Sequence, residues 1–236
     1  MRALLWILSL PHIGVSLLLE ALSPKDLRAD LDRCLAVVAR HGTSIPSILV
    51  EALVLAEDHR NLLHPGIDVI AMTRALWVRS TSGRIQGAST IEQQYVRVVS
   101  NRYERTTARK LREQLLALML SRRADKEAIA SAYLSIAFYG TGSIGIDALK
   151  ARFGGDLSKI SLHEALTVVA QLKHPRPLQQ SAAWQSKISA RLDLLSKRVE
   201  RTMSKAPPTT DKATFESRHR TTAHCRADTT RAGDIS

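Results

Sequence analysis

Two glutamates, Glu57 and Glu113, are the residues of this sequence best suited to acid–base chemistry. Glu57 follows Val50, Leu53 and Val54 at helical spacing, so the pattern places it on the apolar stripe of its own helix. A carboxylate in a partly apolar wall has a raised pKa and can act as a general base. Alternatively, Glu57 ends the helix and faces solvent. The spacing favours neither interpretation over the other.

A dense run of basic residues leads up to Glu113, and its members are Arg102, Arg105, Arg109, Lys110 and Arg112. The apolar residues from Leu111 to Met119 mark the inward stripe of this helix, so we expect Arg109, Arg112 and Glu113 to lie close together on an adjoining face. Such a cluster could neutralise a concentrated negative charge on a substrate. The alternative is a basic face that only meets water.

A loop containing glycine and serine, residues 80–87, precedes another helix. Ser89 and Glu92 have the spacing of a capping box, which predicts a helix start at Ser89. The free N–H groups at a helix start can hold an anion. Every capped helix shares this feature, so the pattern alone is weak evidence for a binding site.

The elements that must position these groups are helices. Apolar residues make up 44% of the chain but aromatic residues only 4%, which favours packed helices over strands. Helix starts are predicted at Asp125 and at a capping box formed by Ser161 and Glu164, and a last amphipathic helix over 185–203. No convincing pair of strands is found. A break falls at His64, which at a turn is more often a structural hydrogen-bonding group than a ligand.

The net charge of +12 predicts a polyanionic partner, which could be nucleic acid, an anionic membrane surface or a phosphorylated substrate. No RNA-binding aromatic signature or zinc-finger spacing supports nucleic acid. The chain also lacks a Walker loop, a GxGxxG motif, an HExxH motif and a nucleophile elbow. Its two cysteines, Cys34 and Cys225, exclude a disulfide scaffold and a thiolate zinc site.

The ends of the chain differ from its middle. An apolar run over residues 3–19 is interrupted by Pro11, His12 and Gly14, so residues 1–22 are predicted to form an N-terminal membrane anchor. A helix that lies on the membrane or packs on the domain is the alternative. Residues 23–44 then form a connecting segment, 45–203 the main domain and 204–236 a disordered basic tail.

Four motifs in register resemble peptidoglycan glycosyltransferase family 51, the transglycosylase module of class A penicillin-binding proteins and of monofunctional transglycosylases. They are Leu55-Ala56-Glu57-Asp58 with His64-Pro65-Gly66-Ile67-Asp68, then Gly87 to Gln94, Arg109 to Glu113, and Tyr133-Leu134 to Gly145. The second motif is highly specific. The resemblance covers residues 45–178 and is closest to the monofunctional form.

The resemblance implies a mainly α, lysozyme-like helical domain and an inverting transfer. In that reaction the acceptor hydroxyl of lipid II attacks the anomeric carbon of the growing glycan. Undecaprenyl diphosphate departs from that carbon as the leaving group. Glu57 matches the family's catalytic glutamate, which takes the acceptor proton, and Glu113 matches its second glutamate on the donor side. Substrate-binding positions are expected at Asp58, His64, Ser89, Thr90, Gln93, Gln94, Arg97, Arg105, Arg109, Lys110 and Arg112.

The resemblance also implies a bacterial inner-membrane location, single-pass or peripheral, with the catalytic domain on the periplasmic side. The expected partners are lipid II, the nascent glycan, the anionic membrane surface and other cell-wall synthesis proteins, with no nucleic acid. The sequence requires no cofactor and predicts no metal ligands, although a divalent cation, Mg²⁺ or Mn²⁺, could assist at the diphosphate.

The chain departs from the family pattern at several positions. Arg97 stands where the family usually has lysine, Asn61 where it has an aromatic, and Val98 where it has asparagine. Ser131 replaces a glutamate and Ser135 an asparagine. These departures point to one alternative to the polymerase, a weakly active or inactive relative that binds cell wall. The carboxylate pair leaves a lysozyme-like glycan-cleaving enzyme as a second alternative, and the basic charge leaves a nucleic-acid protein as a third.

Overall fold

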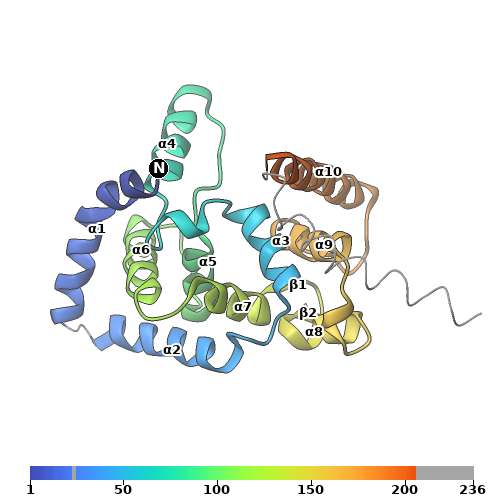
Figure 1. Ribbon diagram of the computed structural model, residues 1–236, viewed down its shortest axis with the longest axis horizontal. Helices are drawn as coiled ribbons and strands as arrows, with labels where there is room; N and C mark the ends of the chain where they lie inside the picture. Colours follow the sequence, from blue (N-terminus) through green and yellow to red (C-terminus); the bar gives the residue numbers. More distant parts are fainter. Residues whose placement is uncertain (23–24, 206–236) are drawn as a thin grey trace, which may run out of the picture.

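The computed structural model describes residues 1–22 and 25–205, and this part of the chain is almost entirely helical (Figure 1). The predicted tail lies outside the described residues from 206 onward, as does Cys225. The ten α-helices described are α1 (Arg2–Leu22), α2 (Lys25–His41), α3 (Ser47–Glu57), α4 (Val69–Ser82), α5 (Ile91–Ser100), α6 (Thr107–Ser121), α7 (Lys126–Ile136), α8 (Gly145–Arg152), α9 (Leu162–Lys173) and α10 (Ala182–Lys205). The mainly α fold predicted from the sequence is therefore confirmed.

The main core lies between α3, α5, α7 and α9, with α6 and α2 against one side of it. Leu53 of α3, Tyr95 of α5 and Leu134 of α7 are fully buried there. The residues that fill this core are leucine, isoleucine, valine and alanine far more than aromatic residues, as the composition predicts. In Figure 1, α5 lies near the centre of the molecule, so side chains on its different faces can contact different helices.

Residues 25–41 are more than a connecting segment. They form α2, whose side chains Leu27, Leu31 and Cys34 belong to the main core. The hydroxyl of Tyr95 donates a hydrogen bond of 2.6 Å to the Cys34 carbonyl oxygen, which fixes α2 against α5. The predicted split between a connecting segment and a domain that starts at residue 45 places this helix outside the unit whose core it helps to build.

A small antiparallel hairpin, β1 (Phe138–Gly140) with β2 (Ser143–Ile144), follows α7, where the sequence shows no convincing strand pair. Such short strands leave little hydrophobic pattern to detect. Gly140 has a φ of 149°, and a Cβ there would lie 2.2 Å from the Arg176 carbonyl oxygen. The glycine-rich turn is thus held against the segment that follows α9. Two short 3-10 helices, Asn61–Leu63 and Leu157–Lys159, complete the described elements.

Helix starts test the predicted caps. The Ser161–Glu164 capping box of α9 is confirmed, with both of its hydrogen bonds present. The box predicted at Ser89 and Glu92 is wrong, because Thr90 caps α5 by accepting a bond from the Gln93 amide. Glu92 instead points into the interior, fully buried.

The N-terminal helix α1 is long and apolar enough to cross a membrane, as its composition predicts. It also packs along α6 and α4, where Ile13 contacts the small cluster of Ile67, Ala117 and Leu118. Figure 1 shows α1 at the edge of the molecule beside α6. One side of α1 thus faces the domain, while most of its large apolar side chains stay exposed.

Candidate active site

Glu57 is the last residue of α3 and lies where α3, α5 and α10 meet. The last carbonyl groups of a helix have no partner within it. Here Arg191 and Arg198 of α10 donate to the carbonyl oxygen of Ala56, each at 3.1 Å. Arg191 also forms an ion pair of 2.8 Å with the Glu57 carboxylate. The Glu57 side chain keeps 18% of its surface exposed, so it remains accessible from solvent.

Glu113 lies on α6 under three cations. Arg97 donates to its two oxygens at 2.8 and 3.2 Å, Lys110 lies 3.3 Å away, and Arg109 also pairs with it. Burial would raise the pKa of Glu113, but the hydrogen bond from Arg97 and the nearby cations bring that pKa below its ordinary value. Three cations against one carboxylate leave a local excess of positive charge. We call Arg97, Arg109, Lys110 and Glu113 the open cluster.

Helix α5 brings the two glutamates to one face. Gln94 donates to Glu57 at 3.5 Å, and Arg97, three residues later, holds Glu113. Residues three apart on a helix are neighbours on its surface. The Tyr133 hydroxyl donates to Gln94 at 3.1 Å. Burial, followed by the charge of Glu57, raises the pKa of Tyr133, while the charge of Arg97 lowers it. Glu57 and the open cluster therefore border the same partly exposed surface.

Lys110 connects the second and third sequence motifs. Its Nζ atom donates to Ser89 at 2.9 Å and to Gln93 at 3.0 Å, besides its contact with Glu113. Burial lowers the pKa of this lysine, although the carboxylate of Glu113 opposes the shift. The side chain keeps 32% of its surface exposed. Of the predicted site residues, Ser89, Gln93, Gln94, Arg97, Arg109 and Lys110 thus gather around the two glutamates.

Asp58 and His64, predicted to bind substrate, lie instead in the interior. Asp58 accepts bonds of 3.1 Å from His64, 3.3 Å from Asn61 and 3.3 Å from the Ile91 amide. Burial would raise the pKa of Asp58, but these hydrogen bonds bring it below its ordinary value. Asn61 also donates to Glu92 at 3.3 Å, and Lys126 pairs with the same carboxylate. We call Asp58, Asn61, His64, Glu92 and Lys126 the closed cluster.

Thr90 is likewise a structural contact in this arrangement. Its side chain is buried, caps α5 and donates a 2.7 Å bond to the Gly66 carbonyl oxygen. Gly66 has a φ of 120°, and a Cβ there would lie 2.6 Å from the Ala117 carbonyl oxygen, so only glycine fits against α6. The first motif is therefore locked to α5 and α6. A direct contact of Asp58, His64 or Thr90 with substrate stays a prediction that their burial does not favour.

Asp58, His64 and Glu92 have the donor types of a metal site, and their ligand atoms lie within 4.8 Å of one another. The hydrogen bonding argues for another use. His64 Nδ1 accepts the Gly66 amide at 3.2 Å, so in the neutral ring the proton sits on Nε2 and points to Asp58. A metal needs the lone pair of that nitrogen. These donors fit a hydrogen-bonded structural network, and a divalent cation at a bound diphosphate stays a prediction.

Two predicted basic residues lie apart from the open cluster. Arg112 turns to α2, where it donates to Asp30 at 2.6 and 2.9 Å. The expectation that Arg112 lies close to Glu113 is wrong, because adjacent residues on a helix point in different directions. Arg105 is exposed in the segment before α6, and its role in binding stays a prediction.

Sequence reasoning missed Arg191 and Arg198. Both lie on α10, which was predicted only as an amphipathic helix. Their spacing of seven residues puts them on one helix face, and this was the available signal. The partner of Arg191 is 134 residues away in the chain, so no local pattern shows which carboxylate that face contacts.

The positions that depart from the family pattern are satisfied locally. Ser131 donates to the His41 carbonyl at 2.8 Å and accepts the Ile45 amide at 3.2 Å. Ser135 donates to the carbonyl of Ser131 at 2.9 Å. Asn61 joins Asp58 to Glu92, and Val98 packs against the main core. These four departures thus change the interior of the domain, whereas the fifth, Arg97, contacts Glu113 directly.

Comparison with known proteins gives independent evidence for the family of this chain. A family model described as transglycosylase matches residues 37–200. Penicillin-binding protein 1A of Aquifex aeolicus is 39% identical over 133 residues, 56% of this chain and 18% of that protein. Penicillin-binding protein 1A of Rickettsia felis is 32% identical over 161 residues, 66% of this chain and 20% of that protein. Penicillin-binding protein 1B of Vibrio cholerae is 33% identical over 138 residues, with 55% and 18% covered. The chain thus spans about a fifth of the length of these relatives.

Proposed function

The chain belongs to the transglycosylase family, and we propose on that basis that it is a peptidoglycan glycosyltransferase that polymerises lipid II. The observation that carries this proposal is the placement of Glu57 and the open cluster on one face of α5. A single carboxylate next to an excess of cations suits a reaction in which a proton is removed from one group while a diphosphate leaves another.

In the proposed reaction the acceptor sugar hydroxyl attacks the anomeric carbon of the growing chain with inversion. The new bond forms as the bond from that carbon to the diphosphate oxygen breaks, and Glu57 takes the hydroxyl proton. Arg191 holds the Glu57 carboxylate in place through their ion pair. General-base catalysis of this kind contributes about 10²–10⁴-fold in rate.

The open cluster would receive the departing undecaprenyl diphosphate. Charge develops on the leaving oxygen, and cations fixed in advance near that position stabilise the transition state. Arg97, Arg109 and Lys110 are held in place by Glu113, which acts as a positioning residue toward them. A hydrolase that cleaves glycan has no diphosphate to neutralise, so this excess of cations supports the polymerase over the glycan-cleaving alternative.

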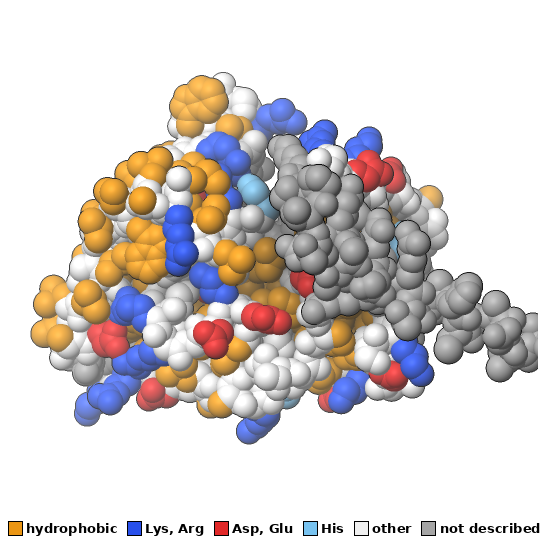
Figure 2. Space-filling model, in the orientation of Figure 1, with side chains coloured by type: hydrophobic (Ala, Val, Ile, Leu, Met, Phe, Trp, Pro, Cys, Tyr) orange, Lys and Arg blue, Asp and Glu red, His pale blue; other side chains and the backbone are white. Residues whose placement is uncertain are grey.

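Exposed apolar side chains on the surface of the molecule support a function at a membrane. Leu4, Ile7 and Leu18 on α1 and Leu76 and Trp77 on α4 are exposed. Figure 2 shows apolar side chains gathered over the side of the molecule where α1 and α4 lie. A lipid-linked substrate would reach the site from that side. We propose a bacterial inner-membrane location with the catalytic domain on the periplasmic side, close to the nascent glycan and other cell-wall synthesis proteins.

The decisive experiment measures glycan chains formed from labelled lipid II by the wild type, Glu57→Gln and Glu113→Gln. Both substitutions should remove product while the thermal unfolding of the domain stays cooperative. Release of muropeptides from sacculi by the same preparations measures glycan cleavage. Cleavage without polymer would replace the proposal by the glycan-cleaving alternative. No product from the folded wild type would leave a cell-wall binding relative, and an unchanged rate in either variant would remove that glutamate from its role.

A further inference from the structure

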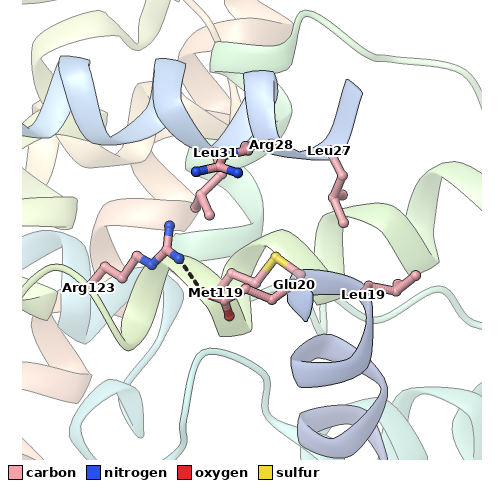
Figure 3. A pocket seen from close by; sticks show the side chains of 7 residues that line it. All are labelled: Leu19, Glu20, Leu27, Arg28, Leu31, Met119 and Arg123. Atoms are coloured by element: carbon pink, nitrogen blue, oxygen red, sulfur yellow. Dashed lines mark hydrogen bonds and ion pairs between the residues drawn. The ribbon is translucent and has the colours of Figure 1, made fainter. Parts of the chain in front are cut away.

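A pocket separate from the Glu57 surface lies where α1 ends and α2 begins. Its walls come from the last turn of α1, the first turns of α2 and the end of α6 (Figure 3). The cavity volume is about 140 Å³, well below the roughly 300 Å³ at which pockets for whole small ligands begin. It could therefore hold only part of a larger molecule.

The two ends of the pocket differ in chemistry. Figure 3 shows Arg28 and Arg123 at one end and Leu19 and Leu27 at the other, with Met119 between them. Leu27 and Met119 are buried, so the floor is apolar. A pocket with a cationic end and an apolar end fits an amphiphile with an anionic head.

At the cationic end, positively charged side chains outnumber negatively charged ones. Glu20 is shared by Arg123 and by Arg122, which lies 2.6 Å from it. Arg28 is exposed, and no ion pair or hydrogen bond joins its side chain to another residue in the described part of the chain. Three arginines thus surround one glutamate at the edge of the pocket, which favours an anion there.

The position of the pocket indicates where that anion comes from. Helix α1 has 21 residues, and at about 1.5 Å per residue it is as long as the hydrocarbon core of a bilayer is thick. Its apolar run stops at Glu20, next to the pocket. A helix end that leaves the hydrocarbon lies at the level of lipid headgroups, where anionic lipids attract basic side chains.

We propose that this pocket binds the headgroup end of an anionic membrane phospholipid. The phosphate would lie between Arg28 and Arg123, and the first part of an acyl chain would lie against Leu19, Leu27 and Met119. The site goes beyond the proposed polymerase and does not rest on it, because within the described residues no hydrogen bond or ion pair joins it to Glu57 or the open cluster. Its occupant is a bulk membrane lipid, not the lipid-linked substrate.

The test uses the full chain reconstituted in phosphatidylcholine nanodiscs. A trace of photoactivatable phosphatidylglycerol, or of the matching phosphatidylcholine, is cross-linked, and the labelled peptides are identified by mass spectrometry. We expect phosphatidylglycerol to label residues 19–22, 25–31 and 119–123 in preference to phosphatidylcholine. Arg28→Gln should reduce this labelling about tenfold, the loss expected for one charge-assisted hydrogen bond.

Arg40→Gln is the matched control, because Arg40 is exposed at the other end of the same helix. It should leave the labelling unchanged. Leu19→Ser tests the apolar end and should reduce labelling while thermal unfolding stays cooperative. Equal labelling by the two lipids, or labelling that Arg28→Gln leaves unchanged, would overturn the proposal. Suppression of the labelling by excess inorganic phosphate would also overturn it, because the pocket would then be an anion site without lipid specificity.

Discussion

Both clusters contact α5, the closed cluster through Glu92 and the open cluster through Gln93 and Arg97, and they use the same residue types for different purposes. In the closed cluster, Asp58 and Glu92 meet Lys126 and His64 at depth, with exposed fractions of the acids at 6% and 0%. In the open cluster, Glu113 meets three cations, and Lys110 keeps 32% of its side chain exposed. The balance of charge and the access to solvent separate a structural network from an anion-binding surface.

This difference has a physical origin. A buried charge costs several kcal/mol unless partners satisfy it, so both carboxylates of the closed cluster accept hydrogen bonds from its other members. The open cluster can carry excess positive charge because water still reaches its cations. These cations can therefore pair with an anion of the substrate. The comparison therefore predicts that changes in the open cluster affect turnover and changes in the closed cluster affect folding.

Among the cations of the open cluster, the largest effect on turnover is expected for Lys110→Met. Loss of one cation near the developing charge should lower kcat/KM by about 10²–10³-fold. The free energy of unfolding should change by only about 1 kcal/mol, because the lost hydrogen bonds are partly exposed. Polymerisation kinetics on lipid II and urea unfolding measure the two quantities.

Lys150→Met on α8 is the matched control for that substitution, because Lys150 is exposed and lies on another helix. Its kinetics should equal those of the wild type. If Lys110→Met lost stability rather than turnover, the open cluster would be a structural network like the closed one, and the comparison would fail.

The next effect is on folding and is expected for Asp58→Asn. The new amide group would place a donor toward His64, Asn61 and the Ile91 amide, which all donate to the carboxylate in the wild type. Breaking such a buried network should cost about 3 kcal/mol of unfolding free energy. The folded fraction should keep its turnover within a few-fold. Lost turnover with unchanged stability would instead place Asp58 in contact with substrate, as the sequence predicted.

The pH dependence sharpens this prediction. The pKa of Asp58 in the folded protein lies below its ordinary value of 3.8. Its contribution to stability is therefore fully present well above that value and disappears as the pH falls through the lower, folded pKa. The difference in unfolding free energy between the wild type and Asp58→Asn should be constant near neutral pH and shrink below about pH 4. A constant difference down to lower pH would contradict the charged role of Asp58.

The sequence predicted the helical fold well, because spacing along helices is a local signal. It also singled out Glu57 and Glu113, whose roles as site glutamates stay predictions. It did not separate the two clusters. Asp58 and Thr90 have polar side chains that suit a ligand, and only packing shows that both are buried. The ion pair of Arg191 with Glu57 joins residues on α10 and α3, so no local pattern could reveal it.

The basic residues of α6 lie on two faces of the helix, and their spacing in the sequence is enough to predict this. Arg109 and Lys110 precede Glu113 by four and three residues, so a regular helix places both beside it. Arg112 precedes it by one residue and therefore points about 100° away. The positive charge of the basic run is evident from the sequence. Helix geometry alone then divides its residues between the Glu113 face and the Asp30 face.

The smallest effect on turnover is expected for Arg112→Ala. Its guanidinium pairs with Asp30 of α2, which is 1% exposed and also pairs with Arg33. Because Asp30 keeps its ion pair with Arg33 and a longer one of 4.0 Å with Arg102, the loss should be about 1–2 kcal/mol of unfolding free energy. Turnover should stay within about threefold of the wild type, since a charge outside the site is screened by salt.

Arg109→Ala is the counterpart on the same helix, because Arg109 contacts Glu113 and Arg112 does not. Its turnover should fall by about 10²-fold, as for other cations near the developing charge. The two arginines are three residues apart and equal in charge, so net charge cannot explain a difference between them. Equal losses in the two variants would mean that the basic run acts through its summed field. The division of charged groups by helix face would then have no consequence for the reaction.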